Sequence, residues 1–202
     1  MLIKFDHIYR KYNMNIHGIL HIGAHDCEEE KFYHAKGIQN IIWIEALKEK
    51  VERFSKGRKI YNYVVSDKDD QEITFKITNN YQSSSILPLK THLKEHPHIH
   101  VIENRVLKTK RMDTVYEKEG IDVKYANFLN LDIQGAELMA LKGMGTILSN
   151  FDYVYTEVNQ KELYEGCCLL GELDQFLGEK GFQRVELSMT RFGWGDALYI
   201  RK

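Results

Sequence analysis

The chain has 202 residues, is 43% hydrophobic and carries 28 basic and 29 acidic side chains, for a formal net charge of −1. This length and apolar content suit one globular domain, 1–202, with a full core. The even charge balance argues against broad binding to nucleic acid or anionic lipid, and no apolar stretch approaches the roughly 20 residues that span a bilayer.

The first third of the chain alternates apolar runs with helical patterns. Strands are predicted at the short apolar runs 18–22, 40–46 and 59–66. Helices are predicted between them at 28–37 and 46–57, because each has helical spacing or an acidic first turn and ends at a glycine. This βαβαβ beginning predicts a parallel sheet that is covered by helices on both faces.

The middle of the chain departs from this rhythm. Residues 71–78 alternate like a half-exposed strand, and 79–85 have the composition of a loop. Residues 87–108 are expected to form a short helix and then an extended segment. The pattern resumes with a helix at 111–120.

The last third returns to alternating strands and helices. Strands are predicted at 125–133 and 152–158, with a helix after each, at 136–148 and 169–181. Two final strands, 182–188 and 194–202, have so short a connection that they must be antiparallel. The expected fold is α/β, a Rossmann-like class I methyltransferase fold, with a mostly parallel twisted sheet flanked by helices and a C-terminal antiparallel hairpin.

Small and acidic residues follow four of the predicted strands, at the carboxyl ends where open α/β sheets bind ligands. Glu45 lies about 20 residues beyond Gly23, the offset at which an acidic residue holds a ribose diol. Each feature alone is also typical of an ordinary turn or helix start, but together they favour a nucleoside-bearing cofactor. The residues predicted to bind it are His21, Gly23, Ala24, His25, Glu45, Ala46, Ser66, Asp67 and Asp132.

The loop after Gly23 fits one cofactor class better than another. The dinucleotide fingerprint would need glycines where the chain has His25 and Glu28, and the acidic residues of this loop would repel a pyrophosphate. A cofactor that carries a cationic amino acid in place of a diphosphate suits the loop better. S-adenosylmethionine is therefore the predicted cofactor, with S-adenosylhomocysteine as the product.

The segment "NLDIQGAELMALKGM" (130–144) resembles the signature of the FkbM-type methyltransferases, K-x-D-x-E-G-x-E-x-x-x-L-x-G. The matching residues are Asp132, Gly135, Glu137, Leu141 and Gly143. The likeness extends to "HIGAH", "IIWIEA", the serine-containing loop and "KRMDTV". It implies an S-adenosylmethionine-dependent enzyme that most often methylates a sugar or polyketide hydroxyl. Two residues depart from the pattern: Cys27 stands where a glycine is common, and Gln134 replaces the usual glutamate.

Methyl transfer to a weakly nucleophilic hydroxyl is helped by a base that takes its proton. Asp132 is the predicted base, although it could instead hold the ammonium group of the cofactor or a divalent metal. Glu137 either caps the Gly135 turn or contacts the acceptor. Ser84, Glu157 and Asn159 are predicted acceptor-binding residues, with an ordinary loop and a polar strand end as the alternatives.

Other residue patterns predict less. His92, His96, His98 and His100 lack a carboxylate or cysteine that would complete a zinc set, so no metal site is predicted. The segment that carries them is instead expected to be solvated, with an acceptor-facing position as one alternative. The three cysteines lack CxxC spacing, so free thiols in a cytoplasmic protein are expected. A small-molecule or glycan acceptor is the expected partner. A catalytically silent module that binds cofactor or glycan is the alternative function, and an NAD-dependent oxidoreductase lacks an identifiable hydride site.

Overall fold

A seven-stranded sheet forms the centre of the protein, in a computed structural model that describes residues 1–202. Its strand order is β3-β2-β1-β7-β8-β10-β9. The bounds of the strands in that order are Lys59–Asn62, Ile41–Glu45, Ile19–Ile22, Phe128–Leu131, Tyr153–Asn159, Trp194–Arg201 and Phe182–Met189. The first five are parallel, and β10 runs antiparallel to both β8 and β9. This confirms the predicted class I methyltransferase fold with its C-terminal hairpin.

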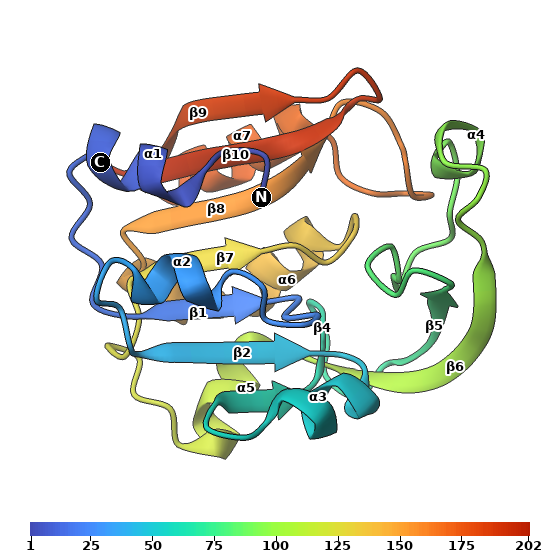
Figure 1. Cartoon of the computed structure of the whole chain (residues 1–202), viewed down its shortest axis with the longest axis horizontal. Helices are drawn as coiled ribbons and strands as arrows, with labels where there is room; N and C mark the ends of the chain where they lie inside the picture. The colour runs from blue at the N-terminus through green and yellow to red at the C-terminus, as the bar shows by residue number, and fades with distance from the viewer.

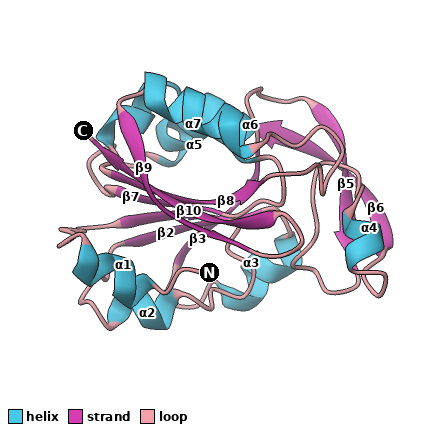
Figure 2. Cartoon of the chain, turned by 90° about the horizontal axis from the view of Figure 1, so that it is seen from above, coloured by secondary structure: helices cyan, strands magenta, loops and turns pink.

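Helices cover both faces of the sheet (Figure 2). One face carries α1 (Phe5–Lys11), α2 (Glu30–His34) and α3 (Lys48–Phe54). The other carries α5 (Met112–Glu119), α6 (Glu137–Gly143) and α7 (Leu170–Glu179). None of these helices combines the length and the apolar character needed to cross a bilayer.

The burial of β1 explains why its sequence is apolar apart from His21. Successive side chains of a strand point to opposite faces, so Leu20 and Ile22 join the core beneath α5–α7 while Ile19 joins the core beneath α1–α3. Both faces are covered, and all four residues of β1 are buried. A strand with two buried faces reads as a continuous apolar run, as predicted for parallel sheets.

A second, three-stranded sheet stands at the carboxyl ends of the parallel strands (Figure 1). It consists of β4 (Val64–Val65), β6 (Val101–Lys110) and β5 (Glu72–Thr78). The short helix α4 (His92–Glu95) lies in the connection between β5 and β6. This unit stands in front of the strand ends that carry the predicted site residues.

The structure corrects four details of the predicted elements. Helix α1 was not predicted, because only Phe5 and Ile8 of this charged segment are buried. The strand expected at 59–66 is divided between β3 and β4, which belong to different sheets. Helix α2 is shorter than 28–37. The helix expected at 136–148 ends at Gly143, and a 3₁₀ helix, η1 (Gly145–Asn150), follows it.

Candidate active site

A cavity of about 560 Å³ lies at the carboxyl ends of β1, β2, β7 and β8. The loop 79–85 and the segment that contains α4 form its outer wall. Eight of the predicted site residues line the cavity: His21, Gly23, His25, Glu45, Ala46, Ser84, Asp132 and Glu157. The structure therefore brings together residues from four separate strand ends and the serine-containing loop.

Gly23 brings the ends of β1 and β7 into contact. Its φ is +93°, and a Cβ added there would lie 1.8 Å from the backbone oxygen of Asp132. The Asp132 N–H donates to the Ile22 carbonyl at 3.0 Å, so the two strand ends are held side by side. A glycine is required here because the chain must adopt a left-handed conformation next to another backbone.

Glu45 is held in place by two backbone donors. The His25 N–H donates to Oε2 at 2.8 Å, and the Leu47 N–H donates to Oε1 at 2.9 Å. Burial raises the pKa of this carboxyl, while the hydrogen bonds from Leu47 and His25 oppose the rise. Each carboxylate oxygen can accept a further hydrogen bond, so Glu45, which lines the cavity, retains capacity for two ligand hydroxyls.

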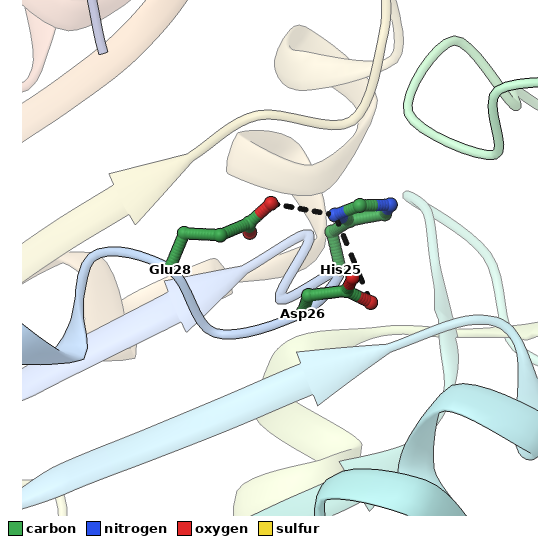
Figure 3. Close-up of side chains that lie close together, drawn as sticks. All are labelled: His25, Asp26 and Glu28. Carbon is green, nitrogen blue, oxygen red and sulfur yellow. Dashed lines mark hydrogen bonds and ion pairs between the residues drawn. The ribbon is translucent and has the colours of Figure 1, made fainter.

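The loop after Gly23 carries the one group of side chains whose ligand atoms are close enough to hold a metal ion: His25, Asp26 and Glu28. Figure 3 shows both carboxylates approaching the same ring nitrogen of His25, with Nδ1 at 3.0 Å from Glu28 and 3.9 Å from Asp26. The Lys50 ammonium contacts Asp26 and lies 3.2 Å from His25 Nε2. Because Lys50 already pairs with Asp26 and His25 with Glu28, the arrangement is that of an ion-pair network that fixes the loop.

Two carboxyl groups, Asp132 and Glu157, meet at the inner end of the cavity. Glu157 is 6% exposed, whereas Asp132 projects into the cavity and is reached by solvent. Burial and then the nearby Asp132 raise the pKa of Glu157 well above its usual value. The pKa of Asp132 is also raised, first by burial, and the hydrogen bond from Gln134 opposes this rise. Because Asp132 is the more exposed of the two carboxyls, it is the one that ionises more readily.

Five predicted site residues do not line the cavity. Ala24 is buried beneath the loop. Ser66 follows β4 rather than β3, so its N–H donates to Lys110 of β6, and Asp67 lies beside it. Glu137 turns inward and accepts the N–H groups of Ile133 and Gly135, which is the capping alternative. Asn159 is 1% exposed, and its amide atoms have no partner.

The structure adds further residues to the wall of the cavity. Trp194 comes from the start of β10, Tyr81 from the serine loop, and His92 and His96 from the α4 segment. The imidazoles of His92 and His96 lie with ring centres 4.9 Å apart. His92 is buried and its Nδ1 has no partner, and burial lowers its pKa to about 4. Trp194 was not predicted, because it lies about 100 residues along the chain from the other three.

Comparison with known proteins agrees with this geometry. The family model of the methyltransferase FkbM domain matches residues 20–184. The 2-O-methyltransferase NoeI of Sinorhizobium fredii (strain NBRC 101917 / NGR234) is 31% identical over 84 residues, which cover 42% of this chain and 34% of NoeI. The match thus spans about a third of that relative's length.

Solved structures resemble the whole chain at low sequence identity. Streptococcus pneumoniae Sp1610, provisionally assigned to tRNA (m1A22) methylation, superposes with a TM-score of 0.50 at 12% identity, over 100% of this chain and 71% of that chain. The magnesium protoporphyrin IX methyltransferase of Synechocystis PCC 6803, solved with bound S-adenosylmethionine, gives a TM-score of 0.49 at 9% identity, over 98% and 76% of the two chains. The superposition on Sp1610 shows that this chain has the methyltransferase fold.

Proposed function

The chain belongs to the FkbM family of S-adenosylmethionine-dependent methyltransferases, and we propose that it methylates a hydroxyl oxygen of a sugar, a glycan or a related small molecule. The observation that carries this proposal is Asp132, a carboxylate at a strand end that lines the same cavity as Glu45. A hydroxyl is a weak nucleophile, so a carboxylate that accepts its proton favours this acceptor class.

The residues at the strand ends fit S-adenosylmethionine. Glu45 has one free acceptor position on each oxygen for the two ribose hydroxyls. Beyond it, the apolar side chains of Leu47, Val64 and Phe75 line the cavity and suit the adenine ring. When bound, the cofactor supplies a methyl carbon that is activated by its positive sulfur, and S-adenosylhomocysteine is the product.

Asp132 would accept the proton that the acceptor hydroxyl loses as its oxygen is methylated. The surrounding protein raises the pKa of Asp132 from its usual value, which brings this group closer to the neutral range where a general base is most effective. The cavity walls would exclude bulk water and align the acceptor, and alignment supplies much of the rate in a displacement of this kind.

The wall formed by the α4 segment and Trp194 supports a sugar as the acceptor. Flat aromatic and imidazole rings of this wall offer apolar faces. A ring-shaped acceptor would pack against such faces. The similarity to NoeI, a 2-O-methyltransferase, supports an oxygen as the atom that is methylated.

The proposal is tested with methyl-labelled S-adenosylmethionine and a panel of glycans, amines and RNA. We expect label on hydroxyl oxygens of a glycan, and a loss of kcat of about 100-fold or more in Asp132→Asn. Asp122→Asn, in an exposed turn, is the matched control. Label on amines or RNA would contradict the proposed acceptor class. If Asp132→Asn instead loses affinity for S-adenosylmethionine at unchanged kcat, this residue holds the cofactor and is not the base.

A further inference from the structure

The Gln134 side chain bridges the two carboxyl groups of the cavity. Its Nε2 lies 2.7 Å from Asp132 Oδ1 and 2.8 Å from Glu157 Oε2, so the two hydrogens of one amide group are donated to two different carboxyls. The Tyr164 hydroxyl donates to Gln134 Oε1 at 2.6 Å. Every polar atom of this amide therefore has a partner: two are carboxyls that line the cavity, and the third is the buried Tyr164 behind them.

These partners leave one chemically sensible orientation of the amide. With Oε1 and Nε2 exchanged, the amide oxygen would face two carboxyl oxygens, and only one of them could carry a proton toward it. The observed orientation gives both carboxyls a donor and gives the Tyr164 hydroxyl an acceptor. The position of Gln134 follows from this satisfied set of hydrogen bonds.

The Gln134 backbone is also held in an uncommon conformation. Its φ is +58°, which costs a residue other than glycine about 1 kcal/mol. The Ser85 hydroxyl donates to the Gln134 carbonyl at 2.7 Å, and Gly135 follows with a φ of +97°. The turn after Asp132 is thereby fixed against the serine loop, and it directs the amide back over the strand end.

Negative charge is concentrated around this amide. Besides burial, Asp196 raises the pKa values of both carboxyls that the amide contacts, and Glu137 raises that of Glu157, while the Met1 amino group acts in the opposite direction on Asp132. The hydrogen bond from Gln134 lowers the pKa of both Asp132 and Glu157. The Gln134 amide is neutral and donates two hydrogen bonds, so it holds the two neighbouring carboxyls close together without adding charge.

We propose that Gln134 is the positioning residue of the proton-transfer site, and that its amide orients the Asp132 carboxylate and holds it in the ionised, proton-accepting state next to Glu157. This inference rests on the proposed function, because it assigns Gln134 a role in the step that Asp132 performs. A glutamate at this position would place a third carboxyl between the other two, so the glutamine of this chain determines how many protons the site holds.

The inference is tested by NMR titration of protein labelled with ¹³C at the Asp and Glu carboxyls, which requires neither cofactor nor acceptor. Gln134→Leu removes both donors, and we expect the titration midpoint of Asp132 to rise by about one pH unit. Gln134→Glu should raise the midpoints of both Asp132 and Glu157. Gln160→Glu adds the same charge at an exposed position one residue beyond β8 and should leave both midpoints unchanged.

A gentler variant covers the case in which Gln134 cannot be replaced without loss of folding. Tyr164→Phe removes only the hydroxyl that donates to the amide oxygen, and a smaller rise of the Asp132 midpoint is expected. Unchanged midpoints in the folded Gln134 variants, or in Tyr164→Phe if those do not fold, would overturn the inference.

A kinetic measurement separates this inference from the proposed function. With an acceptor in hand, the acid limb of kcat/KM should move to higher pH in Gln134→Leu, in parallel with the Asp132 midpoint. A purely structural role would lower activity without moving that limb, and that result would contradict the inference. If no hydroxyl acceptor is ever methylated, the proposed function fails while the titration still reports on the hydrogen bonds of Gln134.

Discussion

Replacing Glu45 by glutamine is the most direct test of the cofactor position. The substitution keeps the size of a side chain that is 8% exposed and fixed by two backbone N–H donors. It changes one oxygen into an NH₂ group, which must face either the His25 or the Leu47 N–H. One acceptor for a ribose hydroxyl disappears, and one backbone donor loses its partner.

The expected effect follows from these two losses. A hydrogen bond to a charged group contributes about 1.5–3 kcal/mol, so the loss of one such bond and the weakening of a second correspond to about 2–4 kcal/mol, or a rise in Kd of about 30-fold or more. The assay is calorimetric titration with S-adenosylmethionine. Glu52→Gln, on the exposed face of α3 where the Glu52 side chain is 65% accessible, is the matched control and should bind like wild type.

The outcome that refutes this reasoning is also clear. If Glu45→Gln is folded, melts at the wild-type temperature and binds S-adenosylmethionine within about threefold of wild type, no ribose diol contacts this carboxylate. If wild type itself does not bind, an acceptor must bind first or the turn at Gly23 has only a structural role. Titration in the presence of the glycan panel distinguishes these two cases.

Two further predictions concern stability. Burial raises the pKa of Glu137 to about 7 from a usual value of 4.5, so between these pH values the folded state binds more protons than the unfolded state. The free energy of unfolding, measured with urea, should therefore fall by about 3 kcal/mol as the pH rises through this range. Glu137→Gln should make the free energy of unfolding nearly independent of pH over the same range. If it falls as steeply in the variant, another group causes the fall. Gly23→Ala places a Cβ 1.8 Å from the Asp132 backbone oxygen, so it should abolish folding or lower the free energy of unfolding by more than about 3 kcal/mol. Gly37 also has a positive φ but lies in open space, so Gly37→Ala should cost only about 1 kcal/mol in thermal unfolding. Equal effects of the two glycine substitutions would contradict the close contact between the strand ends.

Much of the fold could be predicted because the local patterns agree with the tertiary environment. Strands such as β1 and β2 are buried on both faces, so their apolar runs alone identify them. The division of the third strand could not be predicted, because Val64 and Val65 are as apolar as any strand of the main sheet but pair with β6. Which sheet a strand joins is decided by long-range pairing, and a single sequence carries little record of that.

The site was predicted only as far as the strand ends determine it. Gly23, Glu45 and Asp132 meet because the carboxyl ends of parallel strands share one edge of the sheet. Trp194 and His92 reach the cavity from a hairpin and from a connection between strands, whose paths depend on packing over the whole chain. No spacing rule connects Trp194 with His92, so their meeting at the wall of the cavity became visible only in the structure.

The two residues that depart from the family signature are related by backbone conformation. Cys27 and Gln134 both have a positive φ, at +56° and +58°, where glycine would avoid a cost of about 1 kcal/mol. A side chain is kept at such a position when its contacts offset that cost. Cys27 is 4% exposed and packs in the core beneath α1–α3. The Gln134 side chain instead forms hydrogen bonds with Asp132, Glu157 and Tyr164. The first departure therefore serves stability, while the second acts on the carboxyls of the site, which is why Gln134 and not Cys27 is expected to alter the chemistry.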